Sequence, residues 1–520
     1  MSRLHSLGLA AIVGTAVLSG ACGSKGFGHV PGQQRLEIKF VGNSNPGARF
    51  NELPLPVDKT LPFSIVIRAL LPDGSQDTTF TRYVRVSAKP GAIAPLSGQT
   101  TDGRNVLLQN GESVPIDINL GNAFGTTFII ADDLGYVPTD PLRDPPPSCS
   151  NGKDDDGDGL VDYPADPGCA FANDDSEEGG TYARGQSPPI FIKLPRIADA
   201  RGLRCDPTNG CSGNGATPYP KEQLNIDTGY HQRENGAFGF DFDVVVTRLA
   251  PDGFYATDVS DGFRNGPNLK ASGFNSVFVY TFNAPPSLRV CDRVTSLGGT
   301  ASEFFGFTQI SFPTWTLDQW DPSQRKCLVP EPRVLSGSEV LDAPFLLTMS
   351  GSLVRVEGVV GERSVKVTPK FGPGDAVDKN GIYAAGPDAT NCDLNQDGKI
   401  DFTPGNKEND CNAACAKDAE CTEYSNFKAR GTFRLTVSTP GSPPGAIQAD
   451  SSQAADFDPV SMKGKEMRAF GGTLSYFSGG SQFTIEARCA DDIVTDVTKT
   501  PLPSDKACVF PRSPEELNPQ

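Results

Sequence analysis

The stretch SVPIDINL, Ser113–Leu120, places Val114, Ile116, Ile118 and Leu120 at alternate positions, with polar residues or proline between them. Because successive side chains of a strand point to opposite faces, this alternation predicts a β-strand with one buried face. The chain around it contains 56 glycines and 44 prolines among 520 residues, and 37% of its residues are hydrophobic. Frequent turn residues suit short strands better than long helices, so the sequence predicts a mainly β protein.

Similar segments lie on both sides of this stretch. They read LEIKFVG, FSIVIRALLPDG, FTRYVRVSA and TTFIIADD, and turn residues separate them. Strands at this spacing indicate a β-sandwich over residues 35–140. The region is similar to bacterial immunoglobulin-like domains, which implies that fold for the N-terminal part of the chain.

The C-terminal half contains two segments that look like copies of one hairpin. These are SEFFGFTQI at 302–310 and LSYFSGGSQFTI at 474–485. The phrase from Val290 to Ile310 resembles the OB-like modules that accompany secreted bacterial nucleases. The resemblance implies two tandem five-stranded barrels. We expect them at residues 187–335 and 336–500, with an insert at 373–425 in the second and a C-terminal tail at 501–520.

An acidic loop between two cysteines, CSNGKDDDGDGLVDYPADPGC, occupies residues 149–169. Its acidic residues alternate before a glycine, as in loops that wrap one calcium ion with hard oxygen ligands. Gly159 stands where the chain must turn sharply, and glycine adopts the required angles at low cost. The expected ligands are Asp154, Asp156, Asp158, the carbonyl of Leu160, and Asp162.

A second copy of the pattern, CDLNQDGKID, follows at residues 392–401. The expected ligands are Asp393, Asn395, Asp397, the carbonyl of Lys399, and Asp401. Both loops depart from an EF-hand, because Ala165 and Pro404 replace its twelfth-position glutamate. They resemble the calcium loops of thrombospondin type 3 repeats and dockerins, and the first resembles a module common in bacterial surface lipoproteins. We place that module at residues 141–186; the alternative is a solvated acidic linker.

The N-terminus reads MSRLHSLGLAAIVGTAVLSGACGS. Arg3 and His5 precede an apolar stretch over residues 7–18, which is too short to span a bilayer as a stable anchor. This arrangement is typical of an export signal.

The run LSGAC, which ends at Cys22, resembles a bacterial lipobox, although Ser19 replaces the usual leucine. The resemblance implies that Cys22 is acylated and that the membrane is a partner through this N-terminal lipid. Gly23 after the cysteine implies the outer membrane or cell surface. Ordinary secretion with cleavage nearby is the alternative. We expect a signal peptide over residues 1–21 and a tether over 22–34.

The cysteine count agrees with export. Without Cys22, 12 of the 13 cysteines remain, an even number that suits disulfides outside the cytosol. Local spacing suggests the pairs Cys149–Cys169, Cys205–Cys211, Cys291–Cys327 and Cys489–Cys508. Two further bonds in an unknown order would use Cys392, Cys411, Cys415 and Cys421. A zinc site in this last cluster is disfavoured, because it has no CxxC pair and no nearby histidine.

Charge and motif content bear on the function. A net charge of −17 and the absence of any basic run make nucleic acid an unlikely partner. His29 and His231 would be the mature chain's histidines, and no GxSxG, Walker or HExxH motif occurs. Asp491 and Asp492 form the best candidate acid–base pair, but a polar strand end explains them more simply.

Aromatic residues in the two hairpins raise the question of a stacking platform for a nucleic acid or a sugar. Because side chains alternate along a hairpin, we expect about half of them to be core. They are Phe304, Phe305, Phe307, Tyr476 and Phe477.

Together these features predict a membrane-anchored, calcium-stabilised surface protein that binds an unknown protein or glycan partner, or acts as a scaffold, and is not an enzyme. The alternative is an accessory factor for extracellular nucleic-acid or polysaccharide processing through the OB-like barrels.

Overall fold

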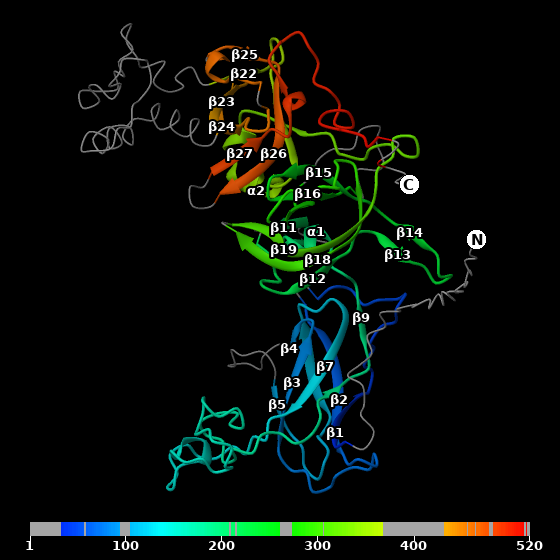
Figure 1. Cartoon of the computed structure of the whole chain (residues 1–520), viewed down its shortest axis with the longest axis vertical. Helices are drawn as coiled ribbons and strands as arrows, with labels where there is room; N and C mark the ends of the chain where they lie inside the picture. Colours follow the sequence, from blue (N-terminus) through cyan, green and yellow to red (C-terminus); the bar gives the residue numbers. More distant parts are fainter. Residues whose placement is uncertain are drawn as a thin grey trace, which may run out of the picture.

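The computed structural model describes residues 33–56, 59–93, 104–206, 210–213, 216–259, 273–304, 306–367, 431–441, 443–454, 456–462, 464–477, 482–513 and 516. Strands dominate these residues, so the prediction of a mainly β protein is confirmed. Helices α1 (Ile197–Ala200) and α2 (Ala343–Met349) are short. Within the described ranges, no helix has both the length and the apolar character needed to cross a membrane. Figure 1 shows a sandwich at one end and two curled sheets at the other.

The N-terminal sandwich consists of two sheets, with strand orders β1-β2-β6-β4 and β5-β3-β7-β8. Ile116, Ile118 and Leu120 point into its core, as their alternation predicts. Val114 lies before β6 and is 72% exposed. The strands are β1 (Arg35–Val41), β2 (Leu61–Leu70), β3 (Tyr83–Lys89), β4 (Ala92–Ile93), β5 (Arg104–Leu107), β6 (Ile116–Gly121), β7 (Gly125–Asp133), β8 (Gly185–Gln186) and β9 (Ile190–Ile192).

Strands β8 and β9 both pair with β7, although 51 residues separate β7 from β8. The chain therefore leaves the sandwich after Asp133 and returns to it at Gly185. The boundary expected after residue 186 falls between these two strands of the sandwich.

The first curled sheet closes on itself. Its pairings run β18-β15-β16-β17-β19 and return from β19 to β18, and β12 pairs with the middle of β18. The pair β17–β19 is parallel, and the other pairs are antiparallel. The strands are β12 (Gln223–Ile226), β15 (Val244–Ala250), β16 (Gly253–Asp258), β17 (Ser276–Tyr280), β18 (Arg293–Phe304) and β19 (Phe307–Asp318). Two small hairpins accompany it: β10 (Leu203–Asp206) with β11 (Gly210–Gly213), and β13 (Tyr230–Gln232) with β14 (Phe238–Phe240).

The second curled sheet follows the order β20-β21-β26-β27-β24-β23-β22-β25. Its last strand, β25, runs after one residue into β26, the third strand of this order, so the chain itself connects the end of the path back to β26. Here β24 and β27 form a parallel pair, as β17 and β19 do in the first. The strands are β20 (Arg333–Leu335), β21 (Leu353–Glu357), β22 (Ser364–Val367), β23 (Thr432–Ser438), β24 (Gly445–Asp450), β25 (Glu466–Met467), β26 (Ala469–Phe477), β27 (Gln482–Glu486) and β28 (Ile493–Val494), which pairs with β26.

One glycine has the same role in both curled sheets. Gly299 in β18 has φ +156°, and Gly472 in β26 has φ +154°. A Cβ atom would lie 2.9 Å from the Ser311 carbonyl oxygen in the first case and 2.1 Å from that of Glu486 in the second. Both glycines therefore let neighbouring strands approach closely, which gives the repeated hairpins of the sequence a shared backbone geometry.

A polar, buried interface joins the two curled sheets. Arg201, fully buried after α1, donates to the carbonyl oxygens of Ser276 (3.1 Å) and Ser350 (2.6 Å). Burial lowers the pKa of Arg201 to about 10. Arg248 in β15 forms an ion pair with Glu486 in β27. Buried guanidinium groups therefore form part of the contact between the two sheets.

The segment after β28 runs back along the first curled sheet, as the red ribbon in Figure 1 shows. The Ser504 hydroxyl donates to the Val329 carbonyl oxygen at 2.9 Å. Arg512 forms a buried ion pair with Asp292, whose Oδ1 lies 2.6 Å from the guanidinium. The expected C-terminal tail is thus, as far as residue 513, held by contacts to segments that adjoin the first curled sheet.

Candidate metal site

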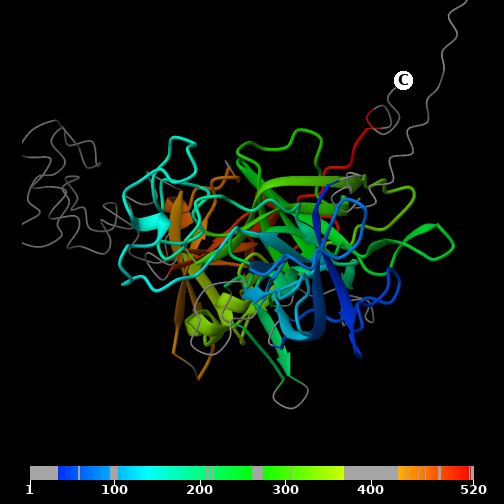
Figure 2. The ribbon, with the colours of Figure 1, turned by 90° about the horizontal axis from the view of Figure 1, so that it is seen from below.

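Residues 134–184 form a module that projects from the sandwich between β7 and β8. In Figure 1 and in Figure 2, viewed from below, it lies to one side of the sandwich. Its return end is anchored by Tyr182, whose ring lies 4.7 Å from that of Phe80. The Asp133 carboxylate accepts hydrogen bonds from the amides of Thr181 (3.0 Å) and Tyr182 (3.1 Å). The module therefore has a fixed base on the sandwich.

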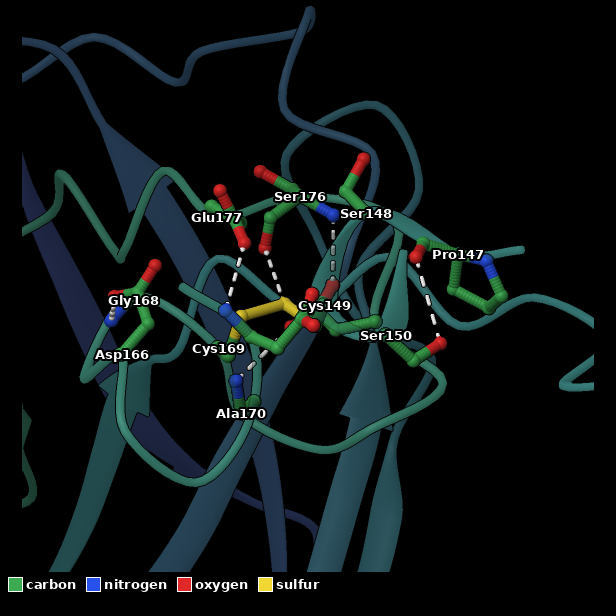
Figure 3. The surroundings of a disulfide bond; sticks show 12 residues. Pro147, Ser148, Cys149, Ser150, Asp166, Gly168, Cys169, Ala170, Ser176 and Glu177 are labelled. Atoms are coloured by element: carbon green, nitrogen blue, oxygen red, sulfur yellow. Dashed lines mark hydrogen bonds between the residues drawn. A yellow bond between two sulfur atoms is a disulfide. The ribbon is translucent and has the colours of Figure 1, made fainter. Parts of the chain in front are cut away.

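The disulfide Cys149–Cys169 closes the acidic loop, with Cα atoms 5.7 Å apart (Figure 3). The Cys149 amide donates to the carbonyl oxygen of Asp174, which is fully buried. The Asp174 carboxylate accepts from the amides of Val137 (2.8 Å) and Ala170 (3.1 Å). Burial raises the pKa of Asp174. A network of backbone amides thus replaces an apolar core around the disulfide.

The carboxylates of Asp154, Asp156 and Asp158 come together on the exposed side of the loop. One oxygen from each lies within 4.8 Å of the others. Asp154 accepts from the amides of Gly157 (2.7 Å) and Gly159 (3.1 Å). Gly159 has φ +95°, the conformation expected of it. The loop therefore presents three carboxylates to one point, and we call this group the aspartate trio.

The chemistry of the aspartate trio fits a hard cation. Residues 141–186 contain eleven acidic and three basic residues, a net charge of 3 − 11 = −8. In the described part of the chain, no lysine, arginine or histidine forms an ion pair with the trio. Three converging carboxylates repel one another, and a divalent cation removes that repulsion. Asp154, Asp156 and Asp158 would hold it through carboxylate oxygens.

Asp162 does not join the aspartate trio, although the loop pattern predicts it as a ligand. Its Oδ1 accepts from the Asn151 amide at 3.0 Å, and its Oδ2 from the Gly152 amide at 2.8 Å. Its carboxylate therefore closes the start of the loop. The backbone of Leu160 contacts the trio, because the Leu160 amide donates to Asp158 Oδ1 at 2.8 Å.

The other cysteines divide into three groups. The structure contains the disulfides Cys291–Cys327 and Cys489–Cys508, two of the pairs suggested by spacing. The pairing of β10 with β11 sets the backbone of Cys205 opposite that of Cys211. The remaining predictions fall outside the described residues: Cys22, the second calcium loop with Asp393, Asn395, Asp397, Lys399 and Asp401, and the cluster Cys392, Cys411, Cys415 and Cys421.

The best acid–base candidate has a structural role. Asp492 is buried and forms an ion pair with Arg488 at 2.8 Å. Burial alone would raise the pKa of Asp492, but the Arg488 guanidinium outweighs burial and lowers it. Asp491 accepts from the Cys508 amide at 3.0 Å. The pair thus holds the strand end beside the disulfide.

His231 also stabilises local structure. Its Nε2 lies 2.8 Å from Asp227 and its Nδ1 3.0 Å from Asp241. Hydrogen bonds to Asp227 and then Asp241 outweigh burial and raise the pKa of His231 to about 9. It is therefore a cation at neutral pH that ties β13 to the residues before and after the hairpin.

Sequence reasoning missed two buried carboxylates behind the aspartate trio, those of Asp166 and Glu177. Glu177 lies eight residues beyond Cys169, outside any spacing pattern that the disulfide defines. The sequence feature that could have indicated them is the number of acidic residues in the module. Several of these lie outside the predicted calcium loop.

Comparison of the chain with protein-family models, with curated proteins and with solved structures gives no match.

Proposed function

We propose that this chain is a calcium-stabilised binding or scaffold protein of a bacterial cell surface, non-enzymatic and anchored through lipid on Cys22. The observation that supports it best is the aspartate trio on a disulfide-closed loop. Such loops suit the outside of the cell, where millimolar calcium is enough for sites of modest affinity. The anchor rests on the sequence around Cys22, and cell fractionation is the measurement that locates the chain.

We further assign the sandwich to the immunoglobulin-like class and the curled sheets to the OB class. The sandwich has two facing antiparallel sheets. The first curled sheet forms a closed ring of five strands with one parallel pair, as a small Greek-key barrel does, and the second contains the parallel pairs β20–β21 and β24–β27. These folds commonly present ligand-binding surfaces, which supports a binding role by analogy.

Calcium should raise the unfolding midpoint of the module. With a Kd of about 0.1–1 mM, 10 mM calcium stabilises the native state by about 1.4–2.7 kcal/mol. Asp156→Asn should remove part of this gain, whereas Asp117→Asn, on an exposed face of β6, should leave it unchanged. Differential scanning calorimetry after EDTA treatment measures both.

Magnesium should substitute poorly, because it requires a tighter octahedral shell. If the unfolding midpoint of the wild-type protein is the same with and without calcium, the proposed metal site is contradicted.

The alternative function, an accessory role in polysaccharide processing, is favoured by two exposed aromatic residues. Phe282 and Phe312 are 53% and 69% exposed, and their ring centroids lie 5.6 Å apart. Both have positive φ, +66° and +50°, an uncommon conformation for bulky residues that is often found at functional sites. Tyr280 extends the row, with its ring 4.6 Å from that of Phe282.

The hairpin aromatic residues singled out in the sequence are less favourable. Phe307 and Tyr476 are half-buried, whereas Phe304 and Phe477 are exposed; Phe305 lies outside the described residues. None of the four described residues belongs to a hydrophobic core cluster, so the expectation that about half would be core is wrong for the described part of the hairpins. The row of Tyr280, Phe282 and Phe312 is the better candidate surface for stacking a neutral sugar.

If the alternative holds, a labelled neutral oligosaccharide should bind, and Phe312→Ala should weaken it about fivefold or more, the effect of losing one stacking contact. Phe510→Ala removes an aromatic ring that is 64% exposed in the tail and should have no effect. Single-stranded DNA should bind no tighter than roughly 10 μM at physiological salt, because the net charge opposes it. Fluorescence anisotropy measures both ligands. Submicromolar DNA binding would contradict the exclusion of nucleic acid.

A further inference from the structure

Asp166 and Glu177 form a buried acidic pair inside the module. Their side chains are 1% and 2% exposed, and a carboxylate oxygen of each lies within 4.8 Å of the other. Figure 3 shows both residues beside the disulfide. Gly168 permits this approach, because a Cβ atom there would lie 1.7 Å from the Glu177 carbonyl oxygen. The backbone is therefore shaped to bring the two carboxylates together.

One oxygen of this pair has no hydrogen-bond partner. Asp166 Oδ1 accepts from the Gly168 amide at 2.6 Å, whereas Oδ2 is buried and unsatisfied. Buried polar atoms are nearly always paired, and an unpaired buried carboxylate oxygen costs several kcal/mol. Asp166 Oδ2 is thus a buried oxygen that is available to coordinate a cation inside the module.

No positive side chain in the described residues balances the pair. Arg143 forms its ion pair with Asp175, and Arg184 with Asp132. The Glu177 carboxylate accepts from the amides of Asp155 and Asp162 (3.2 Å), which are neutral donors. Two buried carboxylates without a cation repel each other in a medium that screens them weakly.

We propose that Asp166 and Glu177 hold a second divalent cation, calcium, behind the aspartate trio. The donors are oxygen atoms, since the nearby Cys169 sulfur is engaged in the disulfide. Oxygen-only donors select calcium over zinc or copper. Glu177 also bonds to the amides of Asp155 and Asp162, so this cation fixes the trio's loop from its inner side.

The test counts calcium ions bound by the full chain after EDTA treatment and calcium addition, using native mass spectrometry. Asp166→Asn and Glu177→Gln should each bind one calcium fewer than wild type. Asp156→Asn should lose one by removing the trio site, and Asp156→Asn with Asp166→Asn should lose two. If the trio variant alone loses nothing, the proposed function fails while the inner site stands.

Asp174→Asn is the matched control. Asp174 is equally buried, but its oxygens already accept from the amides of Val137, Ala170 and Ser176. Its loss should destabilise the module without changing the calcium count. An unchanged count in a folded Asp166→Asn or Glu177→Gln chain overturns the inner site, and indicates a proton shared between the two carboxylates.

A second measurement needs no variant. Wild-type crystals soaked in terbium should give an anomalous peak between Asp166 and Glu177, separate from any peak at the trio. No peak there also overturns the inner site.

Discussion

Asp292→Ala is expected to destabilise the first curled sheet by about 3–5 kcal/mol, the usual cost of leaving a buried charge without its partner. Asp292 is fully buried. Its carboxylate accepts from the amides of Trp320 and Arg289, each at 2.8 Å. It also accepts two bonds from Arg512, each at 2.6 Å, and that guanidinium is 3% exposed. The substitution leaves Arg512 buried and unpaired.

Urea denaturation followed by tryptophan fluorescence measures this loss, because Trp320 donates its amide to Asp292. Asp318→Ala is the control, since Asp318 pairs with Arg325 but is 44% exposed, and its loss should cost under about 1 kcal/mol. Arg512→Met added to Asp292→Ala should recover part of the stability, because it removes the unpaired charge. Equal losses for the Asp292 and Asp318 variants would contradict the assignment.

Replacing Cys149 and Cys169 together by alanine is expected to unfold the module and abolish the calcium binding proposed for it. The bond spans 20 residues, a loop for which chain entropy gives about 3 kcal/mol of stabilisation. The module has few buried apolar side chains to compensate, since backbone amides and carboxylates surround the disulfide. Hydrogen exchange with calcium titration measures both effects.

Cys489→Ala with Cys508→Ala removes a bond of nearly the same span, 19 residues, at the start of the tail. This control should destabilise the tail and leave calcium binding by the module intact. If the two double variants lose calcium alike, the disulfide at Cys149 has no specific role in shaping the metal site.

The sequence predicted local features of the fold well. The alternation of apolar and polar residues identified β6, because successive side chains of a strand point to opposite faces of the sheet. Val114 broke the pattern, since Pro115 has no N–H to pair and the strand begins after it. The repeated hairpins were visible because their aromatic and turn residues recur in one short segment, and the structure adds that Gly299 and Gly472 allow the same close strand approach. These features depend on neighbours in the chain.

Contacts between distant residues could not be predicted. The loop pattern did not indicate that the Asp162 carboxylate accepts hydrogen bonds from the amides of Asn151 and Gly152. Glu177 reaches the loop from beyond the disulfide through a close approach that only the folded backbone reveals. The pairing of Arg512 with Asp292 spans 220 residues, and nothing near either residue indicates it.

That last contact bears on the order in which the chain folds. Asp292 is synthesised long before the segment that carries Arg512, 220 residues further on. Until that segment arrives, the first curled sheet keeps a carboxylate that must stay hydrated, and its interior cannot close. The first curled sheet therefore completes its folding only after the C-terminal segment has been synthesised. A product truncated before residue 512 should remain loosely folded and open to proteases, so incomplete chains would be cleared before they accumulate.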